Sequence, residues 1–282
     1  MAVRNFNEET LTAEVLRRIE DTSNPRLKEV MTSLIKHLHA FVREVRPSPD
    51  EWMTGIKFLT DTGHWSDDKR QEFILMSDTL GVSMLVDFLN YEAKAGMTES
   101  TVQGPFHRVN APEFPLGASV AKDPPDGEPC VVRGTIKTPD GRPIAGAALD
   151  IWETGEHGYD TQKGDAMDLR GIFRTDAEGK FWFRCVKPVS YSVPCDGPVG
   201  AMLTATGRHP MRPAHLHFMI TAPGYDCLVT HIFVKGDKYL DSDAVFGVKE
   251  SLIVDFKKNA AGEWEASYDF VLKPTRQARM AA

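Results

Sequence analysis

The stretch Arg212-Pro213-Ala214-His215-Leu216-His217 leads into the apolar run Phe218-Met219-Ile220, and together they are typical of a strand that enters a protein core. Successive side chains of a strand point to opposite faces, so His215 and His217 should lie on the same face and can bind one metal ion together. Such a histidine pair also occurs as surface or packed residues, so by itself it is a weak signal. Within an apolar strand, however, unpartnered imidazoles would be costly, and a buried ligand site is the better interpretation.

Two tyrosines upstream of this stretch, Tyr159 and Tyr191, favour iron as the metal. Each follows a predicted strand, at loop ends of the kind where ligands to a site commonly lie. Phenolate is a hard donor and the ordinary pKa of tyrosine is about 10, so a strongly Lewis-acidic ion such as Fe(III) would be needed to hold both deprotonated at neutral pH. Either tyrosine alone is more typical of a half-buried aromatic residue. The hypothesis of a ferric site therefore depends on the set of four side chains.

The composition sets broad limits on what the protein does. With 282 residues, the chain is long enough for one large domain or two ordinary ones. The 33 Lys and Arg residues against 40 Asp and Glu residues give a net charge of -7, which argues against nucleic acid as a partner. Residues 1–9 are polar and acidic and no window approaches a membrane span, so we expect a cytoplasmic protein without membrane insertion. The four cysteines lack Cys-x-x-Cys spacing and predict neither a zinc knot nor a disulfide framework.

Residues 8–96 carry the periodicity of helices. Ser48-Pro49-Asp50-Glu51 combines a hydroxyl cap, a proline and an acid three residues after the cap, which predicts the start of a helix. A further helix is expected from about residue 67 to 94. The residues that this helix would turn inward are Ile74, Gly81, Leu85 and Phe88. The clearest apolar stripe at helical spacing consists of Leu27, Val30, Met31, Leu34, Leu38, Phe41, Val42 and Val45.

The pattern changes after Gly96. Residues 103–129 are rich in proline and glycine and have no period, which indicates a linker or the irregular rim of an active site. Short β-branched or aromatic runs then follow without intervening helices and predict an antiparallel β-sandwich. The expected architecture is α+β, with a helical domain for dimerisation or linkage over residues 1–100 and a β-sandwich domain with the ferric site over residues 101–282. The predicted strands are residues 130–137, 147–153, 180–186, 215–220, 228–234, 251–256 and 264–272.

Several short motifs in this chain follow one another in an order that is shared with a known enzyme family. These motifs are Asp150-Ile151-Trp152, Gly158-Tyr159, Tyr191-Ser192-Val193-Pro194, Asp196-Gly197-Pro198, Gly207-Arg208-His209 and Arg212-Pro213-Ala214-His215-Leu216-His217-Phe218. With them the chain resembles the intradiol ring-cleavage dioxygenases, which are non-haem Fe(III) enzymes of aromatic catabolism that use O2 to open catechols between the two hydroxyls. The resemblance covers nearly the whole chain, and the helical first half is similar to the catechol branch of the family.

The resemblance implies roles for the four candidate ligands. It makes Tyr159, Tyr191, His215 and His217 the ferric ligands, and Tyr191 the phenolate that is released when substrate binds and then acts as a base. It implies no flavin, nicotinamide or external reductant. It also implies a homodimer joined through the helical region, often with a lipid-like molecule in an apolar channel. The stripe from Leu27 to Val45 is compatible with such a dimer, but a monomeric helical core would show the same stripe.

Two further residues are candidates for catalysis. Arg212 matches the active-site arginine of the family, where a guanidinium beside the ring could stabilise carbanionic character at the carbon that meets oxygen. The alternative for Arg212 is a salt-bridged loop arginine. His231 stands where catechol dioxygenases usually carry glutamine, and an imidazole can still donate one hydrogen bond. On the sequence alone, His231 either shares the electrostatic role of Arg212 or only packs within its strand.

Asp78 is the residue that bears on the choice of substrate. Its spacing places it on the apolar side of its predicted helix, so it needs a partner, either a backbone group or arginine, or a ring hydroxyl beyond the catechol pair. Leu75-Met76-Ser77-Asp78 and Thr101-Val102-Gln103-Gly104-Pro105-Phe106 resemble the hydroxyquinol 1,2-dioxygenase branch. That resemblance implies cleavage of benzene-1,2,4-triol (hydroxyquinol) to 3-hydroxy-cis,cis-muconate, which tautomerises to maleylacetate. Gln103 departs from the apolar residue expected at its position. The substrate-binding positions that the branch implies are Leu75, Asp78, Val102, Gln103, Gly104, Pro105, Phe106, Val193, Pro194 and Val245.

Three other functions remain open on the sequence. A catechol or chlorocatechol 1,2-dioxygenase would use the same iron chemistry with a differently lined pocket. A zinc hydrolase built on His-x-His would usually take a third histidine or a carboxylate in place of two tyrosines. A transthyretin-like sandwich could bind small molecules or partners without catalysis.

Overall fold

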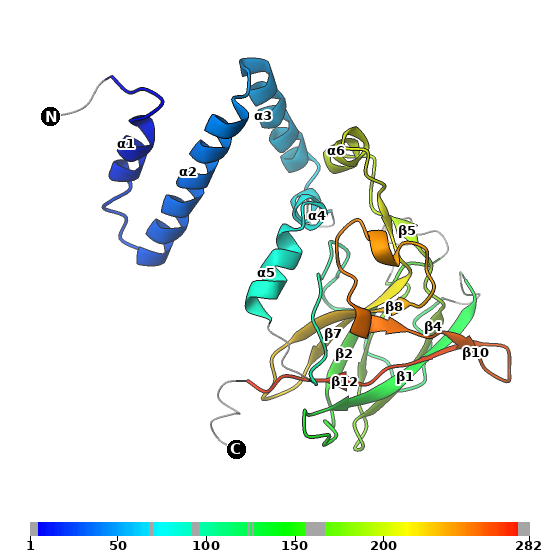
Figure 1. Cartoon of the computed structure of the whole chain (residues 1–282). Coiled ribbons are helices and arrows are strands. Elements are labelled where there is room, and N and C mark those ends of the chain that lie inside the picture. The colour runs from blue at the N-terminus through cyan, green and yellow to red at the C-terminus, as the bar shows by residue number, and fades with distance from the viewer. Residues whose placement is uncertain are drawn as a thin grey trace. The chain divides into compact units, whose positions relative to one another are not determined.

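The computed structural model describes residues 5–67, 70–91, 96–122, 125, 127–155 and 167–275. The chain divides into two compact units, Met1–Thr60 and Asp61–Ala282 (Figure 1). The second unit contains both large sheets and also the helices that lie between residues 72 and 90. The domain boundary expected near residue 100 remains a prediction. None of the helices in the described part of the chain combines the length and hydrophobicity needed to cross a membrane.

Helices alone make up the regular structure of the first unit. They are α1 (Leu11–Arg18), α2 (Pro25–Val45) and the first part of α3 (Pro49–His64). Where α1 meets α2, the Thr12 hydroxyl lies 2.9 Å from Nδ1 of His39. The two helices are therefore joined by a polar contact as well as by the connecting loop.

The predicted start of α3 is confirmed. The backbone N–H of Glu51 donates to the Ser48 hydroxyl at 3.2 Å, and the backbone N–H of Ser48 donates to the Glu51 carboxylate at 2.7 Å. This reciprocal capping box satisfies backbone N–H groups at the helix start that have no partner within the helix.

The apolar stripe of α2 is exposed. None of the residues of this helix is buried, and the side chains of Leu38 and Phe41 are 52% and 57% exposed. Within the described residues, the stripe is therefore not the core of a single chain. A continuous apolar face of this kind is typical of a surface that another molecule covers.

The single helix expected from residue 67 to 94 is instead two helices, α4 (Glu72–Thr79) and α5 (Val82–Asn90). Gly81 separates them with a φ of 73°, a left-handed conformation that ends a helix and that glycine adopts without strain. The predicted inward face is also wrong, because Ile74, Leu85 and Phe88 are exposed. Residues 68, 69 and 92–94 lie outside the described residues. The side chains that α4 and α5 bury are Glu72, Leu75, Asp78, Thr79 and Met84.

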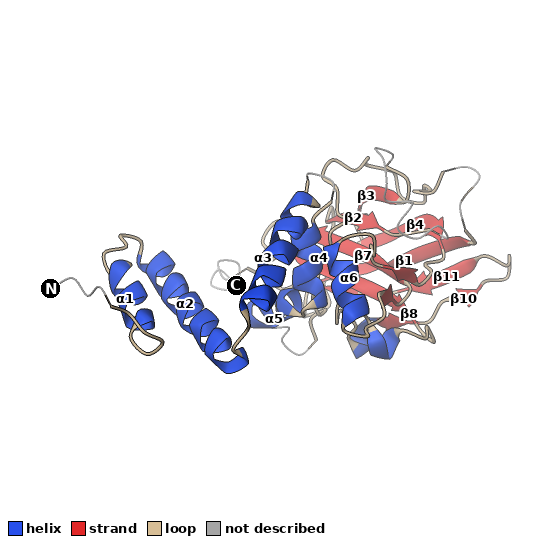
Figure 2. Cartoon of the chain, turned by 90° about the horizontal axis from the view of Figure 1, so that it is seen from above, coloured by secondary structure: helices blue, strands red, loops and turns tan. Residues whose placement is uncertain are grey.

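Two five-stranded sheets form the second unit and lie as layers in Figure 2. The first sheet contains β1 (Pro129–Lys137), β4 (Lys180–Val186), β10 (Lys257–Lys258), β11 (Trp264–Ser267) and β12 (Phe270–Val271). The second contains β2 (Ala148–Trp152), β3 (Arg170–Arg174), β7 (His215–Thr221), β8 (Leu228–Val234) and β9 (Ile253–Val254). The strand order in the second sheet is β3-β2-β7-β8-β9, whereas the first has the order β10-β11-β1-β12 with β4 also paired to β1.

Aromatic rings from both sheets fill the core between them. Phe183 of β4 has its ring centroid 5.0 Å from that of Phe173 in β3 and 6.3 Å from that of Phe218 in β7. Phe270 of β12 lies 4.8 Å from Phe218. All four side chains are fully buried, so this layer holds the two sheets together through apolar burial and ring packing.

The predicted α+β architecture is confirmed, and β4 and β8 coincide with their predicted ranges. The expected strand over residues 251–256 is largely wrong, because Glu250–Leu252 is a 3-10 turn and only β9 pairs. The expected strand over residues 264–272 is interrupted between β11 and β12, where the Asp269 carboxylate accepts the backbone N–H of Thr135 at 3.0 Å. The sandwich also includes parallel pairs, β1 with β11 and β12 and β8 with β9. The elements that the sequence did not predict are β3, β10, β5 (Tyr191–Ser192), β6 (Met211–Arg212), α6 (Pro198–Ala205) and the 3-10 turn Leu240–Ser242.

Candidate active site

His215 and His217 lie on the face of the second sheet that points away from the first sheet. The residues that alternate with them, Leu216 and Phe218, belong to the core between the sheets. The predicted alternation along β7 is therefore confirmed. Both histidines are nevertheless buried, at 2% and 3% exposure. Part of the cover comes from Gly104, because a Cβ atom added there would lie 3.5 Å from Cε1 of His217.

A row of four buried side chains crosses this face of the sheet. The register pairs Arg170 with Trp152, Trp152 with His217, and His217 with His231. Residues directly opposite on neighbouring strands share a face, so these side chains lie side by side. The Trp152 ring stacks on His217 with a centroid distance of 4.6 Å and an interplanar angle of 16°, and the His231 ring meets it edge-on at 4.1 Å. His217 is therefore held from both neighbouring strands, and Trp152, to which the sequence analysis assigned no role, is one of the two supports.

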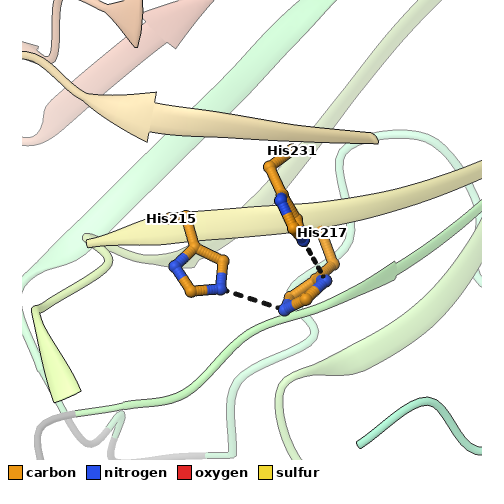
Figure 3. Close-up of side chains that lie close together, drawn as sticks. All are labelled: His215, His217 and His231. Atoms are coloured by element: carbon orange, nitrogen blue, oxygen red, sulfur yellow. Dashed lines mark hydrogen bonds between the residues drawn. The ribbon is translucent and has the colours of Figure 1, made fainter. Parts of the chain in front are cut away.

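The three imidazoles are linked through their ring nitrogens (Figure 3). Nε2 of His215 lies 3.0 Å from Nε2 of His217, and Nδ1 of His217 lies 2.6 Å from Nε2 of His231. Nδ1 of His215 lies 2.6 Å from the carbonyl oxygen of Pro213, which can only accept, so this nitrogen carries the proton and Nε2 keeps its lone pair, which accepts from Nη1 of Arg212 at 3.0 Å. Burial, with a contribution from neighbouring charges, lowers the pKa of all three histidines well below the usual value. The rings are therefore neutral, which is the form that binds metals.

The two Nε2 atoms of His215 and His217 fit a shared metal ion. An imidazole nitrogen lies about 2.0–2.1 Å from a bound ion such as zinc, so two such ligands at right angles are about 3 Å apart. The observed separation is 3.0 Å. With Nε2 on a metal, His217 carries its proton on Nδ1 and donates it to Nε2 of His231, in the way that outer partners orient metal-binding histidines.

His231 is not positioned as a third ligand of the same ion, although its ring lies within the three-histidine cluster whose nitrogens are all within 4.8 Å of one another. Its hydrogen bond is to Nδ1 of His217, whereas Nε2 of His217 points to His215 from the other side of the ring (Figure 3). An ion on both Nε2 atoms therefore has the His217 ring between itself and His231.

Tyr191 and Arg212 are brought together by the short pair of strands β5 and β6, in which they are directly opposite. The Tyr191 ring centroid lies 5.5 Å from that of His215, and Nη1 of Arg212 lies 3.0 Å from Nε2 of His215. Burial raises the pKa of Tyr191, and the charge and hydrogen bond of Arg212 only partly oppose this. Tyr191 thus needs a further cation against its oxygen to become a phenolate near neutral pH. Tyr159, the other predicted ligand, lies outside the described residues.

Asp243 is a buried partner of Arg212 that the sequence analysis missed. Its carboxylate accepts from Nε of Arg212 at 3.1 Å, and both side chains are at most 3% exposed. It also accepts the backbone N–H of Val245 at 3.3 Å and that of Gly247 at 3.0 Å. Burial by itself would lower the pKa of Arg212, but Asp243 raises it above its usual value, so the guanidinium stays charged. No local pattern marks Asp243, because it follows Arg212 by 31 residues and meets it only in the fold.

Several of the predicted substrate positions lie close to this group. Phe106 has its ring centroid 6.4 Å from that of Tyr191. Burial raises the pKa of Asp78 to about 6, against the opposing hydrogen bond from Ser83 and the charge of Arg212. A cavity of 480 Å³ is lined by Asp78, Val102, Gln103 and Gly104 together with Ser77 and Ser83. The predicted positions that are buried are Leu75, Asp78, Val102, Val193, Pro194 and Val245, those that are half-buried are Gly104, Pro105 and Phe106, and Gln103 is exposed.

Comparison with known proteins decides the family of this site. Residues 102–274 match the family described as dioxygenase, and residues 24–98 match that described as catechol dioxygenase N terminus. The chain belongs to the intradiol ring-cleavage dioxygenases. It is 50% identical to 6-chlorohydroxyquinol 1,2-dioxygenase from Cupriavidus pinatubonensis over 97% of this chain and 100% of that protein. It is 48% identical to hydroxyquinol 1,2-dioxygenase from Rhizobium sp. over 95% of this chain and 96% of that protein. The crystal structure of hydroxyquinol 1,2-dioxygenase from Pseudomonas putida superimposes with a TM-score of 0.86 at 45% identity, covering 95% of this chain and 99% of that chain.

Membership of the intradiol dioxygenases confirms the predicted family and sets aside two of the alternatives. The protein is an enzyme, so a non-catalytic transthyretin-like module no longer applies. A zinc hydrolase is likewise set aside, since intradiol dioxygenases depend on iron in general. The two Nε2 atoms 3.0 Å apart are the part of this site that fits such a metal.

We expect the Arg212–Asp243 pair to be essential for stability as well as for the site. Asp243→Ala would leave the Arg212 charge buried without its partner, which typically costs about 3–5 kcal/mol of unfolding free energy. Glu113→Ala, which breaks the exposed pair with Arg174, is the matched control and should change stability little. Urea denaturation of both variants measures the difference. Equal stability of the two variants would show that the buried pair does not hold this region.

Proposed function

We propose that this intradiol dioxygenase cleaves hydroxyquinol with O2 to 3-hydroxy-cis,cis-muconate, which tautomerises to maleylacetate. The observation that carries the proposal is the buried carboxylate of Asp78, which is 2% exposed and within the electrostatic reach of Arg212 and Tyr191. A catechol has no third hydroxyl to satisfy such an acceptor, whereas a benzene-1,2,4-triol has one. The names of the relatives that are 48–50% identical, hydroxyquinol and 6-chlorohydroxyquinol 1,2-dioxygenase, support the same substrate class.

The metal in this proposal is Fe(III), held by Tyr159, Tyr191, His215 and His217. The chemistry that a bound ferric ion supplies is Lewis acidity, which lowers the pKa of the phenols bound to it and prepares the substrate for O2. Trp152 and His231 hold the ring of His217 in place from the two neighbouring strands. We therefore assign His231 the role of a positioning residue, as a third possibility beside the electrostatic and packing roles that the sequence left open.

Arg212 and Tyr191 would carry the acid–base and electrostatic work. A catechol must lose both hydroxyl protons to chelate a metal, and Tyr191, as a phenolate, would accept one of them while a hydroxide ion accepts the other. Arg212, which hydrogen-bonds Tyr191 and is kept charged by Asp243, lies where it can stabilise the negative charge that this transfer places on the ring. The remaining substrate-binding positions, from Leu75 to Val245, would shape the pocket, with Gly104 leaving room beside His217.

The first prediction concerns the metal and its ligands. The purified protein should contain iron and show a visible charge-transfer band of tyrosinate bound to Fe(III), which makes it red to burgundy. His217→Ala should lose most of the iron, and Tyr191→Phe should change the band. His231→Gln should keep the iron because His231 is not a ligand. Metal analysis and visible absorption measure these outcomes, and a colourless protein with stoichiometric zinc would contradict the proposal.

The second prediction concerns Asp78 and the substrate. The kcat/KM of the wild type should be higher for hydroxyquinol than for catechol. Asp78→Ala removes a charged hydrogen-bond acceptor, so it should lower kcat/KM for hydroxyquinol by roughly 10- to 100-fold more than kcat/KM for catechol. The control is Asp87→Asn. Asp87 lines the same cavity but pairs with Lys249, so this substitution should leave the ratio of the two kcat/KM values unaltered. Equal or better turnover of catechol by the wild type would favour the runner-up, a catechol or chlorocatechol 1,2-dioxygenase.

We also infer that the protein is a homodimer joined through its helical region, with an apolar channel there that can hold a lipid. The support is the exposed apolar stripe of α2, which water would otherwise cover. The cytoplasmic location expected from the sequence remains a prediction.

Substitutions in α2 test the dimer directly. Leu38→Glu places a charge in the apolar stripe and should convert the dimer to monomers in analytical ultracentrifugation. Lys36→Glu changes an exposed residue on the other side of the helix and should leave the dimer intact. Mass spectrometry of the denatured wild type would identify a bound lipid. A wild-type protein that sediments as a monomer would rule out this assembly.

A further inference from the structure

The turn between α4 and α5 places two serines beside Asp78. Gly81, in its left-handed conformation, ends α4 and starts α5, so that Ser83 in the first turn of α5 returns to the last turn of α4. The Ser83 hydroxyl lies 2.8 Å from the Ser77 hydroxyl and hydrogen-bonds the Asp78 carboxylate. A Cβ atom added at Gly81 would lie 3.5 Å from the Phe246 ring, so the turn also faces this ring.

The chemistry of these groups gives the chain of hydrogen bonds a direction. A carboxylate can only accept, so Ser83 must donate its single hydroxyl proton to Asp78. The oxygen of Ser83 is then free to accept, and Ser77 is the donor. The hydrogen bond from Ser83 therefore orients the Asp78 carboxylate, and Ser77 supports Ser83.

The two serines are more exposed than the carboxylate that they orient. Asp78 is 2% exposed, whereas Ser77 and Ser83 are half-buried. All three line the cavity of 480 Å³ that also contains Gln103. The serines therefore line the same cavity as the carboxylate, and they are not among the substrate positions implied by the family resemblance.

We propose that Ser83, supported by Ser77, is a specificity-determining residue that holds one oxygen of Asp78 and presents the other to a ring hydroxyl that is not bound to the metal. The ligand class is a 1,2-dihydroxybenzene with a further hydroxyl on the ring. This inference rests on the proposed function, because it gives Asp78 the role of acceptor for that hydroxyl. Ser83 acts through Asp78 and is therefore a positioning residue.

The proposal also predicts a change in the pH dependence of kcat/KM, because several charges act on Asp78. Burial and the charge of Asp243 oppose the carboxylate, whereas Arg212 from β6 favours it. The hydrogen bond from Ser83 also favours the carboxylate, so its loss raises the pKa of Asp78 above the present value of about 6. Asp78 then becomes protonated, and stops accepting, at a higher pH. The acid limb of kcat/KM for hydroxyquinol should move upward in pH, while that for catechol should stay in place.

The experiment compares Ser83→Ala, Ser83→Thr and Ser77→Ala in the iron-loaded enzyme. Ser83→Ala should lower kcat/KM for hydroxyquinol roughly tenfold, mainly through KM, and lower that for catechol much less. Ser83→Thr keeps the hydroxyl and should restore most of the loss. Ser77→Ala should have a smaller effect in the same direction, and it provides the test if Ser83→Ala does not fold. Thermal denaturation of each variant establishes that it is folded.

The outcomes separate this inference from the proposed function. Parallel losses on both substrates, or failure of Ser83→Thr to restore activity, would make Ser83 structural and overturn the inference. If Asp78→Ala lowers the preference for hydroxyquinol but Ser83→Ala and Ser77→Ala do not, the proposed function stands and the inference fails. If the wild type does not prefer hydroxyquinol, the proposed function fails first and the inference fails with it.

Discussion

The hydrogen-bonded register of β2, β7 and β8 is the constraint on which the site depends. It sets His217 directly opposite both Trp152 and His231, so the ring is stacked on one side and hydrogen-bonded on the other. Because side chains alternate along a strand, a slip of one residue would turn both histidines of β7 into the core and bring Leu216 and Phe218 out to the site. The aromatic layer between the sheets prevents this slip, since Phe218 packs there against Phe183 and Phe270. Core packing and site geometry are thus consequences of the same register.

Charge balance is the second constraint, because the site buries several ionisable groups at once. Arg212 is paired with Asp243, and its charge only partly offsets the effect of burial on Asp78 and Tyr191. The pKa values of both are raised by burial, so the protein by itself favours their protonated forms. Neutral histidines add ligands but no charge. The ferric ion that we propose, with its anionic ligands, and a substrate with acidic hydroxyls would supply charges that favour the ionised forms.

The helices before the sandwich contribute in two different ways. In the second unit, the break at Gly81 turns what reads as one long helix into α4 and α5, and this turn places Ser83 against Asp78. The part of the pocket that we propose to discriminate between substrates therefore depends on a glycine conformation and on a helix end. In the first unit, α2 keeps most of its apolar stripe exposed, which is the reason for proposing a second copy of the chain as its cover.

The sequence by itself determined the features that depend on near neighbours along the chain. The alternation of His215 and His217 against Leu216 and Phe218, the capping box at Ser48 and most strand positions follow from local geometry, and ordered motifs identified the family. Only the tertiary structure decided that Asp243 pairs with Arg212, that His231 supports His217 from the next strand, and that Ser83 holds Asp78. The inward face predicted from Ile74 and Leu85 was wrong because burial there depends on the break at Gly81 and on packing with distant elements, not on helical period. Contacts between residues far apart in sequence are set by strand register and chain reversal, which no local pattern encodes.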